Sequence, residues 1–559
     1  SAQTLIKHFN WLKENGYNVI SWQQVIDAEN GKGTLPDNAV LLSFDDGYET
    51  MYNVVFPLLK AYNYPAVFAP VTGWLDTPAD QKIAYADKML DRSVFATWSQ
   101  VKEMEQSGLV EVASHTHNLH NGINANPSGG QLPSVIAPEY KNGKYETEDA
   151  YKNRLKSDFT RSVQTLVNHV GKKPRVMVWP YGQFNDVAVQ LARQAGMPHY
   201  FSLGEKIINK VGDKHIGRLL LNAETDLNTV KNYLDGIDES KQIQRVLHVD
   251  LDYVYDADKA QQAKNLDKLI DRIYRYGVTT VYLQAFSDPD GDGVADALYF
   301  PNKYLPVRDD IFGRIAWQLQ TRAGVQVYAW MPVLAFDLRK SVKEAEYVID
   351  SRTGKPSTKA YLRLSPYNKQ NVEIIKSIYN DLSFYAKFNG ILFHDDAFLT
   401  DFEGAEGNHA EGIVSPQAKQ KTQDLILLTH QLTDALKPYF LRGSYSLKTA
   451  RNLYASVITN PNAEEWLAQN LKTLTENYDT TAIMAMPYME NEQPISQEEA
   501  YQWFASLIEN VKAQAPLDKV LFEFQAVNWR TQKPIPESEL IDWMTLLQKN
   551  HIYSYGYYP

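Results

Sequence analysis

The stretch LLSFDDG, residues 41–47, decides the fold of the first part of this chain, because it ends a short apolar run in two adjacent carboxylates and a glycine. An apolar run of this length next to turn residues predicts a buried β-strand. Two other such runs also end in polar residues: VEVAS (110–114) before His115, and VMVW (176–179) before Pro180-Tyr181-Gly182. In barrel-like α/β folds the carboxyl ends of parallel strands open at one mouth, so we expect these three ends to converge.

Short apolar runs alternate with segments of helical periodicity along the whole sequence, which is typical of α/β proteins with parallel strands. The first series predicts a distorted (β/α)7-type barrel, with strands at residues 39–44, 66–71, 110–113, 176–179 and 216–221 and weaker ones at 18–20 and 199–202. The second series predicts a (β/α)8 barrel, with strands at residues 246–249, 280–286, 325–331, 391–394, 439–442, 482–486, 520–524 and 552–557.

A polar stretch at residues 236–244, GIDESKQIQ, separates the two series. We therefore predict a first domain over residues 1–237 and a second over residues 243–559. Two further polar segments, 127–149 and 401–415, are predicted to be inserted loops.

Composition narrows the kinds of site that this chain can hold. It has no cysteine, so a metal must be bound by His, Asp or Glu. The formal net charge of −11 argues against general affinity for nucleic acid or anionic membranes. No apolar run approaches the roughly 20 residues of a membrane span. The sequence begins with an amphipathic helix, so we expect any signal or lipid anchor to lie outside it.

Asp46, His115 and His120 together offer one carboxylate oxygen and two imidazole nitrogens. Such a set leaves open positions on zinc or a similar divalent ion, as catalytic sites do. Asp45 is adjacent but not needed as a ligand, so it can take a proton from water. The two aspartates alone also fit a turn or helix cap after a strand. Three histidines within six residues favour a metal site, in which His117 is an alternative ligand.

The motifs SFDDG (43–47), SHTHNLH (114–120) and WPYG (179–182) resemble those of carbohydrate esterase family 4, the NodB-homology polysaccharide deacetylases. The five-residue step from His115 to His120 and the full length resemble the biofilm poly-β-1,6-N-acetyl-D-glucosamine N-deacetylases of Gram-negative bacteria within that family.

The resemblance implies a role for each motif residue. Asp45 is the general base, and one divalent ion (zinc, nickel, cobalt or iron) is bound by Asp46, His115 and His120. The turn at Pro180 and Tyr181 contributes the Tyr181 backbone N–H to the oxyanion site.

Two features depart from the family pattern. The arginine two residues before the proline of the third motif is absent, and Arg175 lies five residues before Pro180. The acid histidine of the biofilm subgroup belongs to a motif upstream of the helix with which this chain begins. No histidine here matches it, so we expect this chain to lack the proton donor for the leaving amine and to deacetylate poorly.

The second series contains a separate candidate site where GILFH (390–394) runs into Asp395 and Asp396, at the fourth of the eight predicted strands. Neighbouring strand residues point to opposite sides, so a glycosidase would need a partner carboxylate from elsewhere. Candidate partners are Asp250, Asp252, Asp337, Glu490 and Glu523, and candidate sugar-stacking side chains are Trp330, Trp529, Tyr488 and Tyr555. The resemblance implies that this domain binds partly deacetylated polymer and cleaves it through an aspartate of this segment; a binding-only barrel is the alternative.

The segment 288–296, DPDGDGVAD, has the oxygen spacing of a calcium loop as far as its ninth position. Position twelve is Tyr299 instead of a bidentate glutamate. An Asp/Gly-rich loop without metal is therefore the favoured interpretation.

Three functions fit the sequence. The first is N-deacetylation of poly-β-1,6-N-acetyl-D-glucosamine during biofilm exopolysaccharide export, with a second domain that binds and cleaves the product. The second is a polymer-binding export factor, and the third a deacetylase of chitin oligomers or peptidoglycan. The resemblance also implies a periplasmic protein, lipid-anchored to the outer membrane through a segment not in this chain, with an outer-membrane export porin as partner.

Overall fold

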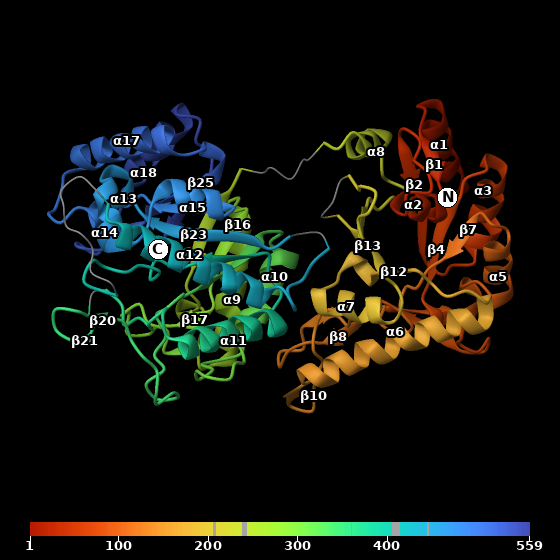
Figure 1. Cartoon of the computed structure of the whole chain (residues 1–559), viewed down its shortest axis with the longest axis horizontal. Coiled ribbons are helices and arrows are strands. Elements are labelled where there is room, and N and C mark those ends of the chain that lie inside the picture. The colour runs from red at the N-terminus through yellow and green to blue at the C-terminus, as the bar shows by residue number, and fades with distance from the viewer. Residues whose placement is uncertain (205–207, 238–242, 359, 405–413, 444–445, 559) are drawn as a thin grey trace. The chain divides into compact units, whose positions relative to one another are not determined.

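Parallel strands build both halves of the computed structural model, which describes residues 1–204, 208–237, 243–358, 360–404, 414–443 and 446–558 (Figure 1). The chain divides into unit 1, Ser1–Lys241 with Leu441–Ser446, and unit 2, Gln242–Phe440 with Leu447–Pro559. The predicted boundary falls on residues 238–242, which lie outside the described part.

Unit 1 contains three groups of parallel strands. They are β1 (Asn18–Ile20) with β2 (Ala39–Leu41), then β3 (Ser43–Asp46), β4 (Ala66–Pro70) and β7 (Val110–Val112), then β12 (Val176–Val178), β13 (His199–Leu203) and β14 (His215–Arg218). A bridge between Ser114 and Met177 joins the second group to the third. The polar residues after β3, β7 and β12 therefore emerge from neighbouring strands at one edge.

Helices and short hairpins complete unit 1. The longer helices are α1 (Ala2–Glu14), α2 (Trp22–Glu29), α3 (Phe56–Tyr62), α5 (Trp98–Gln106), α6 (Glu148–Val170), α7 (Asp186–Gln194) and α8 (Leu227–Leu234). The hairpins pair β5 (Lys82–Tyr85) with β6 (Lys88–Asp91), β8 (Gly122–Asn124) with β9 (Gln131–Pro133), and β10 (Tyr140–Lys141) with β11 (Lys144–Tyr145). The segment 127–149, predicted to be a loop, thus holds β9, the hairpin of β10 and β11, and the start of α6.

Local sequence explains these boundaries. Capping boxes start α2 at Ser21 and α5 at Thr97. Each hydroxyl accepts a backbone N–H of the first turn, and a glutamine side chain in that turn accepts the backbone N–H of the capping residue. Helix α6 ends at Gly171, whose φ of 82° is readily adopted only by glycine. Strand β4 is buried along its whole length, as strands covered on both faces are, and it therefore reads as an unbroken apolar run.

Unit 2 is a closed barrel of eight parallel strands, which confirms the predicted architecture. In order around the barrel they are β15 (Arg245–Val249), β16 (Thr280–Gln284), β19 (Gln326–Met331), β22 (Gly390–Phe393), β23 (Lys448–Tyr454), β24 (Thr480–Met484), β25 (Val520–Gln525) and β28 (Tyr555–Tyr558). The main helices are α9 (Lys259–Arg275), α10 (Phe312–Arg322), α11 (Lys369–Tyr385), α12 (Pro416–Leu436), α15 (Leu471–Asn477), α17 (Gln497–Gln514) and α18 (Glu537–Lys549).

The predicted fifth strand at residues 439–442 is wrong. The fifth barrel strand is β23, whose sequence KTARNLY is too polar to stand out as an apolar run. Its polar side chains are bonded on both faces of the strand: Asn452 donates to Glu523 Oε2 (2.8 Å) inside the barrel, and Arg451 donates to Tyr478 Oη (2.9 Å) on the side of the helices. Residues 441–446 belong to unit 1 instead, where the Arg442 N–H donates to the carbonyl of Phe184 (2.8 Å).

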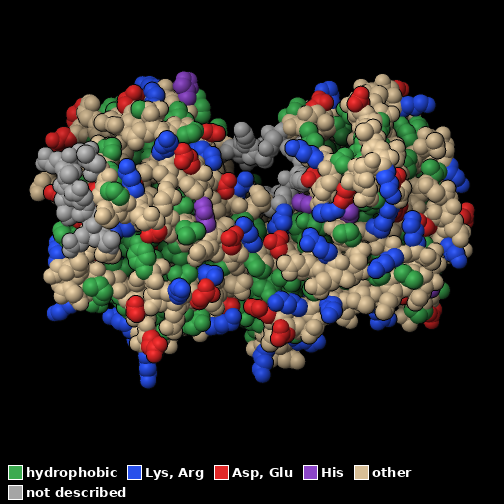
Figure 2. Space-filling model, viewed as in Figure 1, with side chains coloured by type: hydrophobic (Ala, Val, Ile, Leu, Met, Phe, Trp, Pro, Cys, Tyr) green, Lys and Arg blue, Asp and Glu red, His purple; other side chains and the backbone are tan. Residues whose placement is uncertain are grey.

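On the face shown in Figure 2, basic and acidic side chains are interspersed on each unit. Among the helices of the described ranges, none combines the length and the apolar character needed to cross a membrane.

Candidate functional site

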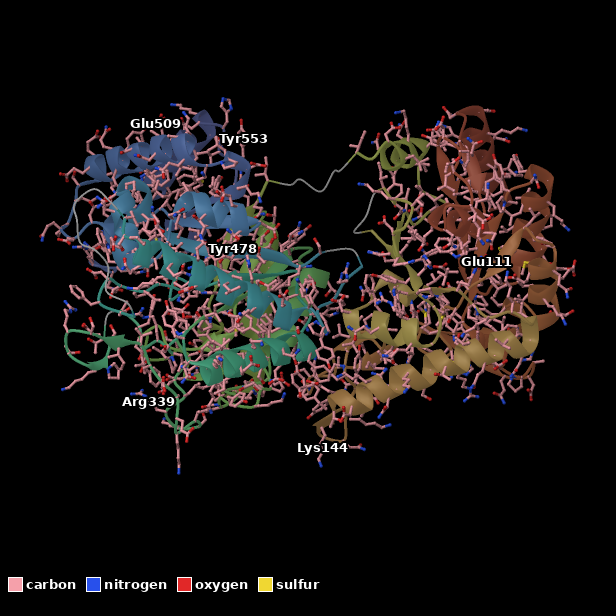
Figure 3. All side chains as sticks on the ribbon, in the orientation of Figure 1. Glu111, Lys144, Arg339, Tyr478, Glu509 and Tyr553 are labelled. Atoms are coloured by element: carbon pink, nitrogen blue, oxygen red, sulfur yellow. The ribbon has the colours of Figure 1, made fainter. Side chains whose placement is uncertain are left out.

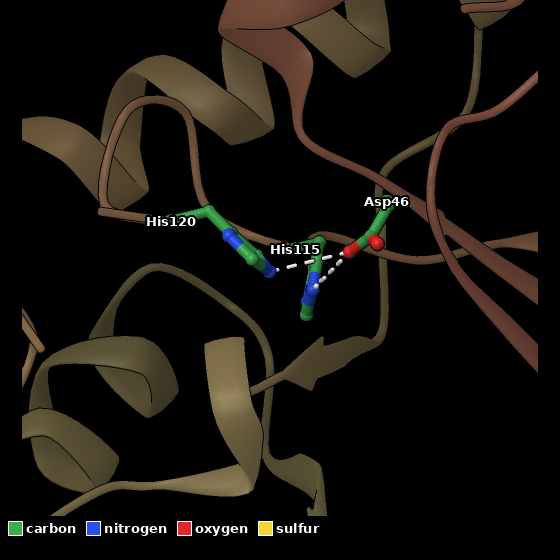
Figure 4. A group of neighbouring side chains, drawn as sticks. All are labelled: Asp46, His115 and His120. Carbon is green, nitrogen blue, oxygen red and sulfur yellow. Dashed lines mark ion pairs between the residues drawn. The ribbon is translucent and has the colours of Figure 1, made fainter. Parts of the chain in front are cut away.

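Asp46, His115 and His120 meet in unit 1 (Figure 4). Asp46 ends β3, and both histidines lie in the loop after β7. Asp46 Oδ1 is 3.3 Å from His115 Nε2 and 3.2 Å from His120 Nε2, and one ligand atom from each residue lies within 4.8 Å of the others. One hard oxygen and two imidazole nitrogens on one side fit a divalent ion with open positions.

The neighbours of these residues fix their orientation. His115 Nδ1 donates to the carbonyl of Val178 at 2.7 Å, which leaves the lone pair of Nε2 for a metal. The ring of His120 lies among Trp74, Tyr85 and Tyr181, with centroid separations of 5.0, 5.8 and 4.5 Å. The Tyr85 hydroxyl donates to Asp46 Oδ2 at 2.9 Å, so Oδ1 remains turned to the histidines.

Backbone strain is concentrated at this site. Asp46, Thr116 and Tyr181 have φ angles of 75°, 68° and 58°, a region that non-glycine residues seldom occupy. Gly47 follows with φ 104°, and a Cβ there would lie 2.9 Å from Leu75 Cδ1. Surrounding contacts must hold these three residues in their conformations. The three residues lie at or shortly after the ends of β3, β7 and β12, where the chain turns.

Asp45 is bound by Arg218, which sequence analysis missed. The guanidinium donates to Oδ1 at 2.8 Å and to Oδ2 at 2.9 Å, and Arg218 also reaches Ser43 on β3. Burial raises the pKa of Asp45, but the charges of Arg218 and His115 outweigh burial and lower it. Asp45 is therefore ionised, as a general base has to be.

Arg175 does not contact Asp45. It forms a two-pronged pair with Glu111 on β7, with distances of 2.9 and 2.7 Å (Figure 3 labels Glu111). Arg218 ends β14, and a charged residue at a strand end is a signal that sequence can give. The signal was missed because three leucines after Arg218 extended the predicted strand to residue 221. Leu220 is 64% exposed in the structure, so these leucines do not continue the buried strand.

His117, the alternative ligand, turns away from the metal cluster. Its Nδ1 is 3.0 Å from Thr72 Oγ1, and burial lowers its pKa. Asp158 on α6 accepts the backbone N–H groups of His117 and Asn118 at 2.8 and 2.7 Å. Burial raises the pKa of Asp158 to about 6. His117 and Asp158 thus shape the loop that carries the two ligands.

The mouth of the unit 2 barrel is built around Asp395. Its Oδ1 accepts from Tyr361 Oη at 2.8 Å and lies 2.9 Å from His394 Nε2, and its Oδ2 accepts from Tyr454 Oη at 3.3 Å. The indole N–H of Trp330 can only donate, so His394 Nδ1 accepts it at 2.8 Å and His394 Nε2 carries the proton toward Asp395. Burial raises the pKa of Asp395, but these donors outweigh burial and lower it.

The structure corrects the role predicted for Asp396. Its side chain is 0% exposed, and its oxygens accept the backbone N–H groups of Val333, Leu334 and Ala335 at 2.7 to 3.0 Å. These bonds fix the loop that leaves β19. Asp396 is an anchor of the backbone and offers no free oxygen to a substrate.

The predicted stacking side chains are mostly inside the protein. Trp330 is 2% exposed and lies beneath His394, so it offers no exposed face to a sugar. Tyr488 and Tyr555 are also buried, and the hydroxyl of Tyr488 donates to Glu539. Trp529, which packs edge-on against Tyr558, is partly exposed and remains the candidate of the four.

The Asp/Gly-rich loop brings Asp288, Asp290 and Asp296 within reach of one another. The oxygens of Asp288 accept the N–H groups of Asp292 (3.1 Å) and Gly293 (2.9 Å) of the same loop. The favoured interpretation, a loop without metal, stays a prediction.

Comparison with known proteins matches each unit to a family. Residues 32–200 match the polysaccharide deacetylase model, and residues 248–558 match the model of hypothetical glycosyl hydrolase family 13. Poly-β-1,6-N-acetyl-D-glucosamine N-deacetylase of Escherichia coli strain K12 is 40% identical, over 100% of this chain and 86% of its own length.

Two solved structures resemble single units. The glycoside hydrolase domain of PgaB (BpsB) from Bordetella bronchiseptica is 38% identical over 57% of this chain and 94% of its own, with a TM-score of 0.51. A de-N-acetylase from Aggregatibacter actinomycetemcomitans is 67% identical over 42% of this chain and 89% of its own, with a TM-score of 0.41. From its full-length relative and its two family matches, the chain belongs to the poly-β-1,6-N-acetyl-D-glucosamine N-deacetylase family, with a polysaccharide deacetylase domain followed by a glycosyl hydrolase-like barrel.

Proposed function

We propose that unit 1 removes N-acetyl groups from poly-β-1,6-N-acetyl-D-glucosamine. The observation that carries the proposal is the meeting of Asp46, His115 and His120 beside Asp45, which Arg218 holds ionised. The name of the E. coli relative, to which the chain is similar over its full length, supports this substrate.

The residues divide the work of amide hydrolysis. Asp46, His115 and His120 would hold one divalent ion (zinc, nickel, cobalt or iron), which when bound polarises the amide carbonyl and acidifies water. Asp45 takes the proton of the attacking water, and Arg218 keeps its carboxylate oriented. The strained turn at Tyr181 presents its backbone N–H to the developing oxyanion, while the ring, 40% exposed, lines the entrance.

Two substitutions test this division. Asp46→Ala should abolish stoichiometric metal binding, measured by elemental analysis after dialysis against a chelator and reloading. Asp45→Asn should bind metal like the parent protein and lose acetate release from acetylated glucosamine oligomers. Full acetate release by Asp45→Asn would overturn the assignment of the base, and unchanged metal content of Asp46→Ala would overturn the ligand set.

We further propose that unit 2 binds partly deacetylated polymer and cleaves it. Asp395 is ionised, 6% exposed and placed at the carboxyl end of β22, where barrel enzymes hold their catalytic groups. The match to the glycoside hydrolase domain from Bordetella supports hydrolysis. Product lengths from chemically deacetylated oligomers should stay unchanged over time with Asp395→Asn, whereas cleavage equal to that of the parent would leave unit 2 a binding module.

Linkage and cellular location are parts of the same proposal. β-1,4-linked chitin oligomers and peptidoglycan fragments would be poor substrates beside β-1,6-linked oligomers, and equal acetate release would contradict this. The proposed site of action is the periplasm, with product passed to an outer-membrane export porin. The acidic net charge supports retention of a polymer that gains free amines. Cross-linking in cells that carry the export genes would detect the porin.

A further inference from the structure

We propose that Glu490 is the proton donor to the glycosidic oxygen in unit 2, acting with Asp395 as the ionised partner. The inference deepens the proposed hydrolase function and rests on it. Glycoside hydrolysis needs one carboxyl group that keeps its proton and a second that is charged. The structure allows these roles to be assigned among the acidic side chains of the barrel mouth.

Asp395 is unsuited to be the acid. Tyr361, Tyr454 and His394 all direct hydrogens at its two oxygens. Hydrogen bonds to the charged form stabilise it, so Asp395 stays a carboxylate at neutral pH. It therefore suits the partner that faces positive charge at the anomeric carbon.

Four other carboxylates are occupied by structural bonds. Asp252 is occupied by an ion pair with Arg308 (2.7 Å) and Asp337 by one with Arg339 (2.8 Å). Glu523 is 0% exposed and sits between His248 and Asn452. Asp396 anchors backbone N–H groups, as described above. Asp288 lies in the same region, but its two oxygens accept the N–H groups of Asp292 and Gly293. Of the candidate partners named from the sequence, Glu490 and Asp250 remain.

Glu490 lies on the same side of the mouth as Asp395. It ends α16 (Pro487–Glu490), the short helix after β24, and its side chain is partly exposed. Its Oε1 accepts the Ala455 N–H at 3.2 Å, directly after Tyr454, whose hydroxyl contacts Asp395. Asp395 and Glu490 thus flank the end of β23.

The strand positions of Asp395 and Glu490 agree with the separation of the two carboxyl groups in glycosidases. Asp395 follows β22 and Glu490 follows β24, two strands further around the barrel. Two strand spacings are about 10 Å along the wall, and side chains that reach inward shorten this separation. The carboxyl groups of glycosidases are about 5 to 10 Å apart.

The environment of Glu490 keeps its proton in place. Burial raises its pKa to about 7, the charge of Asp395 adds to the increase, and hydrogen bonds from Ala455 and Ser456 oppose it. Asp395 is shifted the other way. Two carboxyl groups whose environments separate their pKa values are the usual arrangement of an acid and its charged partner.

Asp250 is the rival. Burial also raises its pKa to about 7, with contributions from Asp252 and Asp288. Its Oδ1 is already occupied by the Asp252 N–H (2.8 Å) and Gln284 Nε2 (3.0 Å). It follows β15, three strands from β22, whereas Glu490 follows β24, two strands from β22.

The step balances as follows. The Glu490 carboxyl proton passes to the glycosidic oxygen as its bond to C1 breaks, and the bonding pair leaves with that oxygen as a sugar hydroxyl. The Asp395 carboxylate stabilises the positive charge at C1. Water then supplies a hydroxyl group to C1, and its other proton restores the Glu490 carboxyl.

The test uses the full chain and two substrates. One is a partly deacetylated β-1,6-linked glucosamine oligomer, and the other is a short oligomer of the same kind with a 4-nitrophenyl leaving group, which departs without protonation. Glu490→Gln should lower kcat/KM on the first by roughly 10²- to 10³-fold, lose the basic limb of the pH profile, and change cleavage of the second less than about tenfold. Glu490→Asp should recover part of the lost activity, and Asp250→Asn is the matched control.

Each result decides the assignment. Full oligomer cleavage by Glu490→Gln, equal losses on both substrates, or the selective loss appearing in Asp250→Asn would overturn the role of Glu490 while hydrolysis itself stands. A parent protein that cleaves neither substrate would overturn the proposed hydrolase function and the inference with it.

Discussion

Tyr85 shows how one hydroxyl group can tune the candidate metal site. It donates to the oxygen of Asp46 that does not face the histidines, at 2.9 Å. Hydrogen bonds to the ligands themselves typically change metal affinity by about 10- to 100-fold. Tyr85→Phe should therefore weaken metal binding by about tenfold or more, measured by competition with a chelator of known affinity.

A matched control for this prediction exists in the same unit. Tyr52 donates to Glu103 Oε2 at 2.8 Å, so Tyr52→Phe also deletes a tyrosine–carboxylate bond but leaves Asp46 untouched. Metal affinity should stay at the parent value in Tyr52→Phe. If Tyr85→Phe binds metal as tightly as this control, Asp46 does not depend on Tyr85.

Arg218 acts on the base instead of the metal. Arg218→Met removes both hydrogen bonds to Asp45 and leaves its carboxylate free to turn. Acetate release should fall by roughly 10²-fold or more, because a base must be held within hydrogen-bond reach of its proton, while metal content stays the same. Arg175→Met, which breaks only the pair with Glu111, should affect deacetylation far less. Equal losses in both variants would argue for a general effect on stability.

At this scale the sequence predicted the residues whose chemistry is unusual and missed those that support them. Asp46, His115 and His120 were predicted because three histidines lie within six residues and the aspartate ends a predicted strand. Arg218, Tyr361 and Tyr454 are ordinary residue types, and their roles depend on side chains far away in the chain. No local pattern distinguishes a tyrosine that meets Asp395 from one in a barrel core.

The Asp/Gly-rich loop of unit 2 makes room for Tyr361. A Cβ on Gly293 would lie 1.9 Å from Tyr361 Cε1, and Gly293 has φ +80°. Gly293→Ala should push the ring away from Asp395 and lower polymer cleavage by about tenfold or more, without changing acetate release by unit 1. Time courses of product length and of acetate measure the two effects separately.

Gly291 provides the control within the same loop. Its φ is +74°, so alanine there brings a similar backbone strain, about 1 kcal/mol, but its Cβ would meet no atom within 4 Å. Gly291→Ala should retain polymer cleavage. Similar losses in both variants would show that backbone strain, and not the contact with Tyr361, causes the effect.

Strand β23 explains why one element of the barrel escaped prediction. Apolar runs identify parallel strands that are buried on both faces, and seven of the eight barrel strands were found in this way. In β23 the side chains of Arg451 and Asn452 are buried, but Asn452 is paired with Glu523 inside the barrel and Arg451 with Tyr478 on the side of the helices. Polar pairing of this kind depends on the closed barrel, so it has no signature in the local sequence.

Each unit has its own hydrophobic core, so the architecture of each could be predicted from its own strands and helices. The core of unit 2 runs continuously from Val246 to Tyr555, and separate clusters around Phe68 and Val178 fill unit 1. The core of unit 2 also contains a buried lysine that links its stability to pH. Lys387 is 1% exposed and donates to the carbonyls of Ser383 (2.8 Å) and Tyr439 (3.0 Å).

Burial lowers the pKa of Lys387 to about 7 from 10.5. Between these pH values the unfolded chain binds a proton that the folded protein does not, so the free energy of unfolding rises with pH across this window. Relative to Lys387→Met, which carries no charge, the parent should gain roughly 3 to 5 kcal/mol between pH 7 and 10.5. Urea unfolding of both proteins at several pH values measures this difference.

The pH dependence of the difference separates this effect from lost contacts. Removing the ammonium also leaves two carbonyls without their donor, which costs about 1 to 3 kcal/mol each at every pH. That cost separates the curves of unfolding free energy against pH for the parent and Lys387→Met, but it does not change their slopes. Lys472 is exposed on α15, so Lys472→Met should follow the parent curve at all pH values. Parallel curves for the parent and Lys387→Met would mean that Lys387 keeps its charge in the folded barrel.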